Sequence, residues 1–247
     1  KMAGLDVGHV EAGERTHTIF NPFPEEIIRI IVDRFSTVAF ASSDQAVENL
    51  KRENFKGKLV EIGYNTVVDS VILAQSKNKV LSEDLPNRYV LVSIHRFETI
   101  KSKKRLEVLV SGLQDIGKNF KIVWGLHEPT KIALEKNNLL HQVKAIPDIH
   151  LRGLFDYFEF IKAIQKAEFL VTDGGGPQEE SWLLNVPCLL MRSETERAQH
   201  KNVFMSGFDL QKILFFIEHY KTFVQPSGPQ IMSPSEQIVD YLLEHYR

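Results

Sequence analysis

The sequence predicts an α/β protein built on parallel sheets. Short runs of β-branched and apolar residues alternate along the chain with longer amphipathic segments, and this alternation is typical of repeated strand–helix units. The chain has 247 residues, of which 43% are hydrophobic and 25% charged, so it can bury the core of one large or two modest globular domains. No apolar run reaches the roughly 20 residues needed to cross a bilayer, and we expect no membrane partner.

Each expected strand is a short apolar run, and each expected helix is a longer segment between two such runs. The expected strands are Leu5–Val10, Thr37–Ala41, Leu59–Ile62, Tyr89–Ile94, Lys121–Trp124, Phe169–Thr172 and Pro187–Met191. The expected helices are Pro24–Phe35, Asp44–Glu53, Lys103–Ile116, Tyr157–Lys166, Pro177–Leu184, Leu210–Tyr220 and Ser235–Tyr246. In the first of these helices, Ile27, Ile28, Ile31 and Phe35 are expected to face inward.

Two polar stretches predict domain boundaries. The stretch Gln75–Asn87 separates three expected strands from the renewed strand–helix alternation, and Pro226–Ser233 isolates the last helix. We therefore expect a first Rossmann-like lobe over residues 1–75, a second over 76–230, and a final helix, 231–247, that packs back on the first lobe. Three strands are fewer than the five or six of a doubly wound sheet, so the first lobe is expected to be incomplete.

Charge and cysteine content narrow the function classes. The formal net charge of −2 does not favour a nucleic-acid or anionic-membrane partner. Cys188 is the single cysteine and lies in an apolar run, so it cannot form an internal disulfide. A buried structural thiol in a reducing, cytoplasmic setting explains it better than a nucleophile does.

The strongest local motif runs from Thr172 to Glu180, T-D-G-G-G-P-Q-E-E, between an expected strand and an expected helix. Gly174, Gly175 and Gly176 allow close approach of a ligand to the backbone. Free amides and the helix dipole at this point favour a diphosphate, and Glu180, one turn later, is placed to accept hydrogen bonds from ribose hydroxyls. A plain glycine turn with acidic residues at a helix start is the alternative.

Three further motifs follow strand ends or start a helix. Gly8–Gly13 contains His9 and Glu11, which share one face if the strand is regular there. His95 and Arg96 follow another strand, where an imidazole and a guanidinium can hold a diphosphate and protonate a leaving group. Glu25 lies in the segment 21–26, where acidic residues in a first helical turn complement the dipole. Structural roles account for each of these motifs taken alone.

Together the motifs resemble the non-hydrolysing bacterial UDP-N-acetylglucosamine 2-epimerases. The resemblance rests on G-H-V-E-A-G-x-R-T from Gly8, N-P-F-P-E-E-x-x-R from Asn21, H-R at His95, and D-G-G-G-P-Q-E-E-S from Asp173. The segment M-R-S-E-T-E-R from Met191 is also similar to a family motif. Order and spacing match from Gly8 to about Gly207.

The resemblance implies a GT-B architecture with two Rossmann-like lobes and a cleft between them, a homodimer, a UDP-sugar substrate, and no metal or cofactor. It implies that Glu11, Glu25 and His95 are catalytic. Arg96, Phe160, the glycines 174–176 and Glu180 are then expected to bind the substrate, with Phe160 near the uracil and Glu180 at the ribose. His127 lies where the family has a histidine of a regulatory sugar-nucleotide site.

The expected reaction is interconversion of UDP-N-acetylglucosamine and UDP-N-acetylmannosamine at C2 by elimination and re-addition of UDP, in surface polysaccharide biosynthesis. Three alternatives stay open: a hydrolysing relative that releases N-acetylmannosamine and UDP, a related diacetamido-sugar epimerase, and a non-catalytic UDP-sugar-binding remnant. A glycosyltransferase of the same architecture is less favoured, because it gives Glu11 and Glu25 no purpose.

Overall fold

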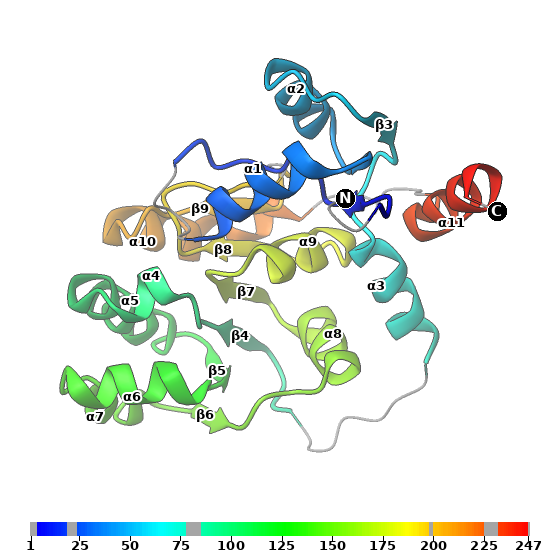
Figure 1. The fold of residues 1–247 in the computed structure, drawn as a ribbon. Helices are drawn as coiled ribbons and strands as arrows, with labels where there is room; N and C mark the ends of the chain where they lie inside the picture. Colours follow the sequence, from blue (N-terminus) through cyan, green and yellow to red (C-terminus); the bar gives the residue numbers. More distant parts are fainter. Residues whose placement is uncertain (1–3, 19–23, 78–84, 198–199, 225–231, 247) are drawn as a thin grey trace. The chain divides into compact units, whose positions relative to one another are not determined.

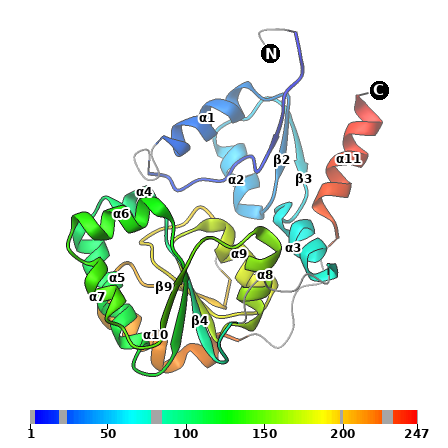
Figure 2. The same cartoon turned by 90° about the horizontal axis from the view of Figure 1, so that it is seen from below.

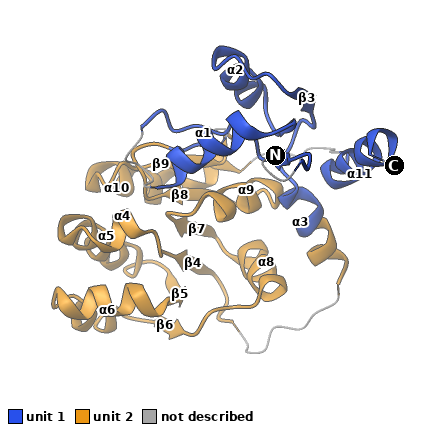
Figure 3. Ribbon diagram, in the orientation of Figure 1, with its two compact units in different colours: residues 1–70, 195–198, 230–247 blue, residues 71–194, 199–229 orange. Residues whose placement is uncertain are grey.

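The computed structural model describes residues 4–18, 24–77, 85–197, 200–224 and 232–246. It divides into two compact units (Figure 3). Unit 1 comprises residues 1–70, 195–198 and 230–247, and unit 2 comprises residues 71–194 and 199–229. Each unit contains one parallel sheet (Figure 1), and the predicted α/β class is confirmed.

Unit 1 is built on three parallel strands in the order β1 (Gly8–Val10), β2 (Val38–Ala41) and β3 (Lys58–Glu61). Its helices are α1 (Glu25–Phe35), α2 (Asp44–Arg52), the start of α3 (Val67–Ser76) and α11 (Pro234–His245). Alternate residues of β2 face opposite sides of the sheet. Ala39 and Ala41 pack on α2, whereas Val38 and Phe40 belong to a cluster with Ile238 of α11.

Helix α1 presents its polar side inward, which is the reverse of the prediction. Ile28, Ile31 and Phe35 are 52%, 50% and 59% exposed, while Glu26 and Asp33 are each 2% exposed. The cause is hydrogen bonding. Glu26 accepts from the amides of Thr16 and His17, and Asp33 contacts His9 of β1 and accepts from Gly13 and Arg15 of the following loop. These bonds hold the carboxylates inside, and the apolar stripe faces outward. Asn21, Pro22 and Phe23 lie outside the described residues.

Unit 2 contains a six-stranded parallel sheet in the order β6-β5-β4-β7-β8-β9. The strands are β4 (Tyr89–Ser93), β5 (Lys121–Gly125), β6 (Ile149–Arg152), β7 (Phe169–Thr172), β8 (Cys188–Leu190) and β9 (Val203–Met205). The chain first builds outward from β4 to β6 and then returns to build from β7 to β9 on the other side. The order therefore reverses between β4 and β7, which is the point where open α/β sheets bind ligands.

Helices cover both faces of this sheet. One face carries α5 (Lys103–Ile116), α6 (Glu128–Lys136), α7 (Leu140–Lys144), α10 (Leu210–His219) and the 3-10 helix η1 (Tyr220–Phe223). The other carries α8 (Tyr157–Lys166) and α9 (Gly175–Leu183), and Figure 2 shows the two sets on opposite sides of β4. The short α4 (Phe97–Ile100) follows β4 directly. Val90 and Val92 point to the first face, Tyr89 and Leu91 to the second.

Cys188 lies in the core cluster beside α8 and is fully buried. Burial raises the pKa of its thiol to about 12, so the thiolate that a nucleophile requires is disfavoured. Among the described residues, no helix is both long enough and apolar enough to span a membrane.

Candidate active site

The ends of β4 and β7 are joined by side-chain hydrogen bonds at the reversal point of the unit 2 sheet. Ser93 and Thr172 are register partners, and the Thr172 hydroxyl donates to the Ser93 carbonyl at 2.8 Å. The next residue, Asp173, is fully buried. Its carboxylate accepts from the backbone amides of His95 and Arg96 at 3.1 and 3.0 Å. Asp173 therefore fixes the loop after β4, a role that the sequence motif contained but did not reveal.

His95 lies at the mouth of this junction with its side chain 40% exposed. Its Nδ1 is 3.8 Å from Asp173 Oδ1, and its ring stacks on His127 with centroids 4.7 Å apart. Burial, and then the proximity of His95, lower the pKa of His127. The lowered pKa favours the neutral form of the His127 imidazole.

The glycine turn starts α9 two residues earlier than predicted, at Gly175. Gly174 is the N-cap, and its amide donates to the Thr172 hydroxyl at 3.1 Å. The amides of Gly175 and Gly176 fall in the first turn, where helix N–H groups lack intrahelical acceptors. Those two amides and the helix dipole make this end of α9 suited to an anion.

Gly174 also allows close packing against the histidine. A Cβ atom there would lie 3.0 Å from Pro177 Cδ and 3.3 Å from His95 Cε1. A side chain at this position would therefore press on the imidazole ring. The absence of one lets His95 lie directly against the glycine turn.

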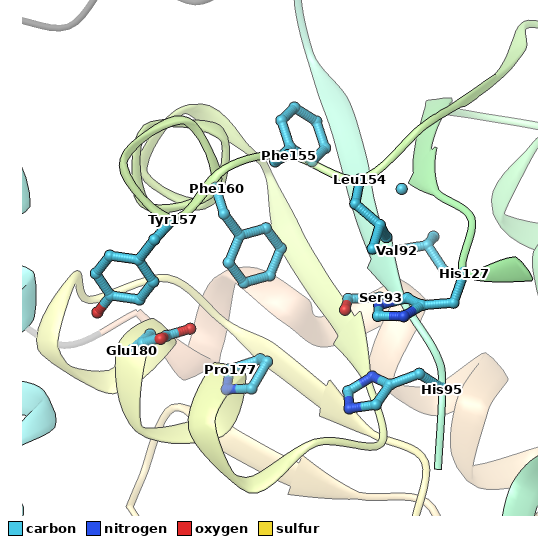
Figure 4. Close-up of a pocket in the computed structure, with 11 residues that line it drawn as sticks. Val92, Ser93, His95, His127, Leu154, Phe155, Tyr157, Phe160, Pro177 and Glu180 are labelled. Carbon is cyan, nitrogen blue, oxygen red and sulfur yellow. The ribbon is translucent and has the colours of Figure 1, made fainter. Parts of the chain in front are cut away.

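A cavity of about 320 Å³ opens beside these groups (Figure 4). It is lined by Val92, Ser93, His95, Gly125, His127, Leu154, Phe155, Tyr157, Phe160, Pro177 and Glu180. The structure thus brings together three of the predicted site residues, His95, Phe160 and Glu180. Aromatic rings of Phe155, Tyr157 and Phe160 form one side, and the start of α9 forms another. Its apolar and aromatic lining with a few polar groups is typical of a small-molecule site.

Glu180 is the buried carboxyl group of this cavity, only 5% exposed. Its Oε2 has no hydrogen-bond partner among the described residues. Burial raises the pKa of Glu180 to about 7, against a hydrogen bond with Tyr157 that lowers it. Figure 4 shows the Tyr157 hydroxyl beside the carboxyl group. An unsatisfied buried acceptor facing a cavity is well placed to bind hydroxyl donors of a ligand.

Arg96 is placed differently from the other predicted residues of unit 2. It is the N-cap of α4, and its Nε lies 3.4 Å from Glu98 Oε2. Among the residues that line the described cavity, Arg96 does not appear. Its backbone amide is held by Asp173, so it contributes to the shape of the loop.

In unit 1, Glu11 is held by two donors. It follows β1 directly and has a φ of +64°, an uncommon conformation for a residue with a side chain. Asn65 Nδ2 donates to Oε1 at 2.5 Å, and Arg197 Nη2 donates to Oε2 at 2.9 Å. Burial alone would raise the pKa of Glu11, but Arg197 and Asn65 outweigh burial and lower the pKa. The carboxylate is therefore ionised and suited to act as a base.

A shared face for His9 and Glu11 requires a regular strand through both residues, but β1 ends at Val10. The two side chains have different partners. His9 Nδ1 lies 2.5 Å from Asp33 Oδ1, and Arg15 Nη2 donates to Asp33 Oδ2 at 2.6 Å. Arg15 also donates twice to Glu53. Burial opposes ionisation of Asp33, but His9 and Arg15 lower its pKa overall. His9 therefore belongs to a structural network.

Glu25 is the exposed first residue of α1. One turn further along the same helix, Arg29 is among the cations that lower the pKa of Glu11. Arg197 lies at the end of the M-R-S-E-T-E-R segment that is similar to a family motif, and in the structure it pairs with Glu11. Asn65, which the sequence analysis does not assign to the site, is the second donor to Glu11.

Comparison with known proteins gives consistent matches. The family model of UDP-N-acetylglucosamine 2-epimerase matches residues 1–222. The UDP-N-acetylglucosamine 2-epimerase of Methanocaldococcus jannaschii is 32% identical over 227 residues, covering 87% of this chain and 62% of that protein. The UDP-2,3-diacetamido-2,3-dideoxy-D-glucuronate 2-epimerase of Pseudomonas aeruginosa is 30% identical over 196 residues, covering 78% and 53%. The chain thus spans less than two thirds of the length of these curated relatives.

Among solved structures, the Methanocaldococcus jannaschii enzyme in complex with UDP-GlcNAc and UDP superposes with a TM-score of 0.86. The sequence identity is 30%, and the match covers 98% of this chain and 70% of that one. The fold class of two Rossmann-like lobes, the GT-B type, is confirmed by this match. The roles predicted for individual site residues stay predictions.

Proposed function

The chain belongs to the UDP-N-acetylglucosamine 2-epimerase family, and from this premise we propose that it interconverts UDP-N-acetylglucosamine and UDP-N-acetylmannosamine. The observation that carries the proposal is the carboxylate of Glu11, which accepts hydrogen bonds from Arg197 and Asn65 just after the end of β1. A base of this kind is what inversion at C2 requires. The relative from Methanocaldococcus jannaschii was solved with UDP-GlcNAc and UDP, which supports the substrate class.

The C2 hydrogen of the sugar has no adjacent carbonyl group, so direct removal by a carboxylate is too slow. In the proposed reaction the C1–O bond breaks first, and its electron pair leaves with UDP. The oxocarbenium-like centre acidifies the C2 hydrogen, a carboxylate takes this proton, and the C–H electron pair forms a C1–C2 double bond. Return of a proton to the opposite face and re-addition of UDP give the epimer, with no net loss of atoms or charge.

The groups of unit 2 are proposed to hold UDP. The amides of Gly175 and Gly176 at the start of α9 suit the diphosphate. His95, beside a neutral His127, can donate a proton to the leaving oxygen. Glu180, whose Oε2 faces the cavity without a described partner, is proposed to accept hydrogen bonds from the ribose hydroxyls. Phe160 offers an aromatic face for the uracil ring.

The groups of unit 1 are proposed to act on the sugar. Glu11 removes or returns the C2 proton, and Glu25 is the second predicted carboxylate for the opposite face. Further proposals follow from the family alone: a homodimer, a cytoplasmic location, a non-hydrolysing outcome, and a role in surface polysaccharide synthesis.

A second substrate is favoured by one observation. The relative from Pseudomonas aeruginosa, 30% identical, acts by its name on a diacetamido-dideoxyglucuronate. We therefore propose UDP-2,3-diacetamido-2,3-dideoxy-D-glucuronate as the second candidate substrate. The test measures C2 inversion of this UDP-sugar and of UDP-N-acetylglucosamine in parallel. The preferred substrate is the one with the higher kcat/KM for C2 inversion.

Proton NMR of the full-length protein with UDP-N-acetylglucosamine in deuterated water tests the reaction. Formation of UDP-N-acetylmannosamine with deuterium at C2 supports the proposal. Release of free N-acetylmannosamine would instead indicate hydrolysis, and UDP binding without turnover would indicate a non-catalytic binding protein.

Glu11→Gln tests the base directly. Exchange at C2 should fall by about 100-fold or more, the usual contribution of general base catalysis, while UDP affinity stays within about twofold because Glu11 does not belong to the nucleotide cavity. Glu48→Gln is the matched control, because Glu48 is an exposed carboxylate of the same unit that forms an ion pair with Arg52. Unchanged exchange in Glu11→Gln, or equal loss of exchange in both variants, would contradict the assignment.

A further inference from the structure

Glu14 is a buried carboxyl group that has no role in the reaction as proposed so far. It lies three residues after Glu11 in the loop that follows β1, and it is 4% exposed. The Ser42 hydroxyl donates to its Oε1 at 2.5 Å. Arg15 Nη1 donates to its backbone carbonyl at 2.9 Å. Both its side chain and its backbone are thus fixed close to the proposed base.

Glu14 lies among charged groups that already include another carboxylate. Its charged neighbours are Glu11, Arg29 and Arg197. Arg197 contacts Glu11 at 2.9 Å, and Arg29 Nη2 lies 3.9 Å from Glu196 Oε1. Each of these two guanidinium groups thus has a carboxylate other than Glu14 close to it. An ionised Glu14 would add a further carboxylate that is itself buried, and burying an additional charge is costly.

Protonation of Glu14 and ionisation of Glu11 are mutually supporting. Burial raises the pKa of Glu14, against opposing effects of Ser42, Arg197 and Arg29, and Glu11 raises it further. The pKa of Glu11 is lowered by the same Arg197. When two neighbouring carboxyl groups have pKa values that differ in this way, one can stay protonated while the other is ionised.

We propose that Glu14 is a positioning residue that holds a proton while Glu11 is ionised, so that Arg197 stays directed at Glu11. The inference rests on the proposed function of Glu11. When Glu14 loses its proton at higher pH, its carboxylate competes for the Arg197 guanidinium and repels Glu11. The base then loses its alignment, and C2 exchange declines.

The pH profile of C2 deuterium exchange tests this role. In the full-length protein the rate should rise as Glu11 ionises and then fall, by up to tenfold per pH unit, as Glu14 ionises. Glu14→Gln keeps an amide oxygen for Ser42 but cannot ionise, so the alkaline fall should vanish. The variant should then exceed the unsubstituted protein at alkaline pH. Persistence of the same alkaline fall in Glu14→Gln would overturn the proposal.

Ser42→Ala provides a second variant with a defined direction. The Ser42 hydrogen bond favours the ionised form of Glu14, so its removal should move the alkaline fall of exchange to higher pH. A shift to lower pH would contradict the proposal. Glu48→Gln, on the exposed side of the same unit, should retain both arms of the profile. These changes should appear in kcat rather than KM, since Glu14 is not proposed to bind substrate.

A measurement without turnover separates this inference from the proposed function. Carbon-13 NMR of the glutamate carboxyl groups, with Glu14 assigned by its loss in Glu14→Gln, should show Glu14 titrating above its ordinary value of 4.5. Glu11→Gln removes a negative neighbour and should lower the pKa of Glu14. If this coupling is present but no C2 exchange occurs, the proposed function fails and the proton-holding state stands. Titration at or below the ordinary value overturns the inference itself.

Discussion

Glu180→Gln gives the sharpest test of the nucleotide cavity. The ionised form of this carboxyl group is proposed to bind the ribose, but burial makes the same form unfavourable for the stability of the folded protein. Its pKa is raised from 4.5 to about 7 by burial. A carboxyl group with a raised folded pKa contributes its full stability below the ordinary value, and this contribution is lost as the pH rises through about 7. Each tenfold change in an ionisation constant is worth about 1.4 kcal/mol, so the whole difference amounts to about 3 kcal/mol.

The assay is the unfolding free energy of the ligand-free protein and of Glu180→Gln, measured by urea titration between about pH 4 and about pH 8.5, a range that brackets both pKa values. Any constant cost of burying the amide cancels when the two ends of the pH range are compared. The unfolding free energy of the variant minus that of the unsubstituted protein should increase by about 3 kcal/mol from the acidic to the alkaline end of the range. Glu128→Gln, whose side chain is 67% exposed, should show no such trend.

UDP binding should change in the opposite sense. Hydrogen bonds from ribose hydroxyls to an ionised Glu180 are charge-assisted and therefore strong. Because Glu180 in the free protein is ionised only above its pKa of about 7, the affinity for UDP should rise with pH up to that value. Glu180→Gln should weaken binding by about 10-fold or more, the usual worth of a hydrogen bond to a charged group, and remove the pH dependence. A stability difference that is flat with pH would refute the burial argument, and unchanged affinity would remove Glu180 from the ribose site.

Two further predictions concern packing around the two sites. Asp33→Asn removes the buried one of two carboxylates that pair with Arg15, while Glu53 remains, and should lower the unfolding free energy by about 1–3 kcal/mol in urea titration. The exposed Asp240→Asn should have little effect, and equal losses in both variants would contradict the network. Gly174→Ala should displace the His95 ring by a few tenths of an ångström and lower kcat for C2 inversion. Gly153→Ala, where an added Cβ meets nothing within 4 Å, is its control, and full activity of Gly174→Ala would show that this close packing is dispensable.

The central strands were readily predicted because they are fully buried. Sequences such as YVLVS of β4 and FLVT of β7 are continuous apolar runs, as both faces of a parallel strand require. The edge strands β6 and β9 were missed. Ile149–Arg152 contains a histidine and an arginine, and Val203–Met205 is only three residues long. An edge strand needs less apolar surface, so its periodicity gives no clear signal.

Helix α1 shows why burial could not be predicted from apolar spacing alone. Its isoleucines follow a helical period, but tertiary hydrogen bonds to Glu26 and Asp33 decide which side turns inward. The same limit applies to the sites. Motifs located His95 and Glu180, whereas the partners that tune Glu11 come from positions 54 and 186 residues away in the chain. Such long-range partners carry no local pattern.

The hydrogen bonds of Thr172 and Asp173 affect how fast a nucleotide can associate with this site. The Thr172 hydroxyl joins the end of β7 to the end of β4, and the Asp173 carboxylate holds the amides of His95 and Arg96 in the loop after β4, so the two loops cannot rearrange independently. A site that is already ordered loses little conformational freedom when its ligand arrives. Association should then be limited by diffusion and orientation rather than by loop closure, giving stopped-flow traces with a single concentration-dependent phase.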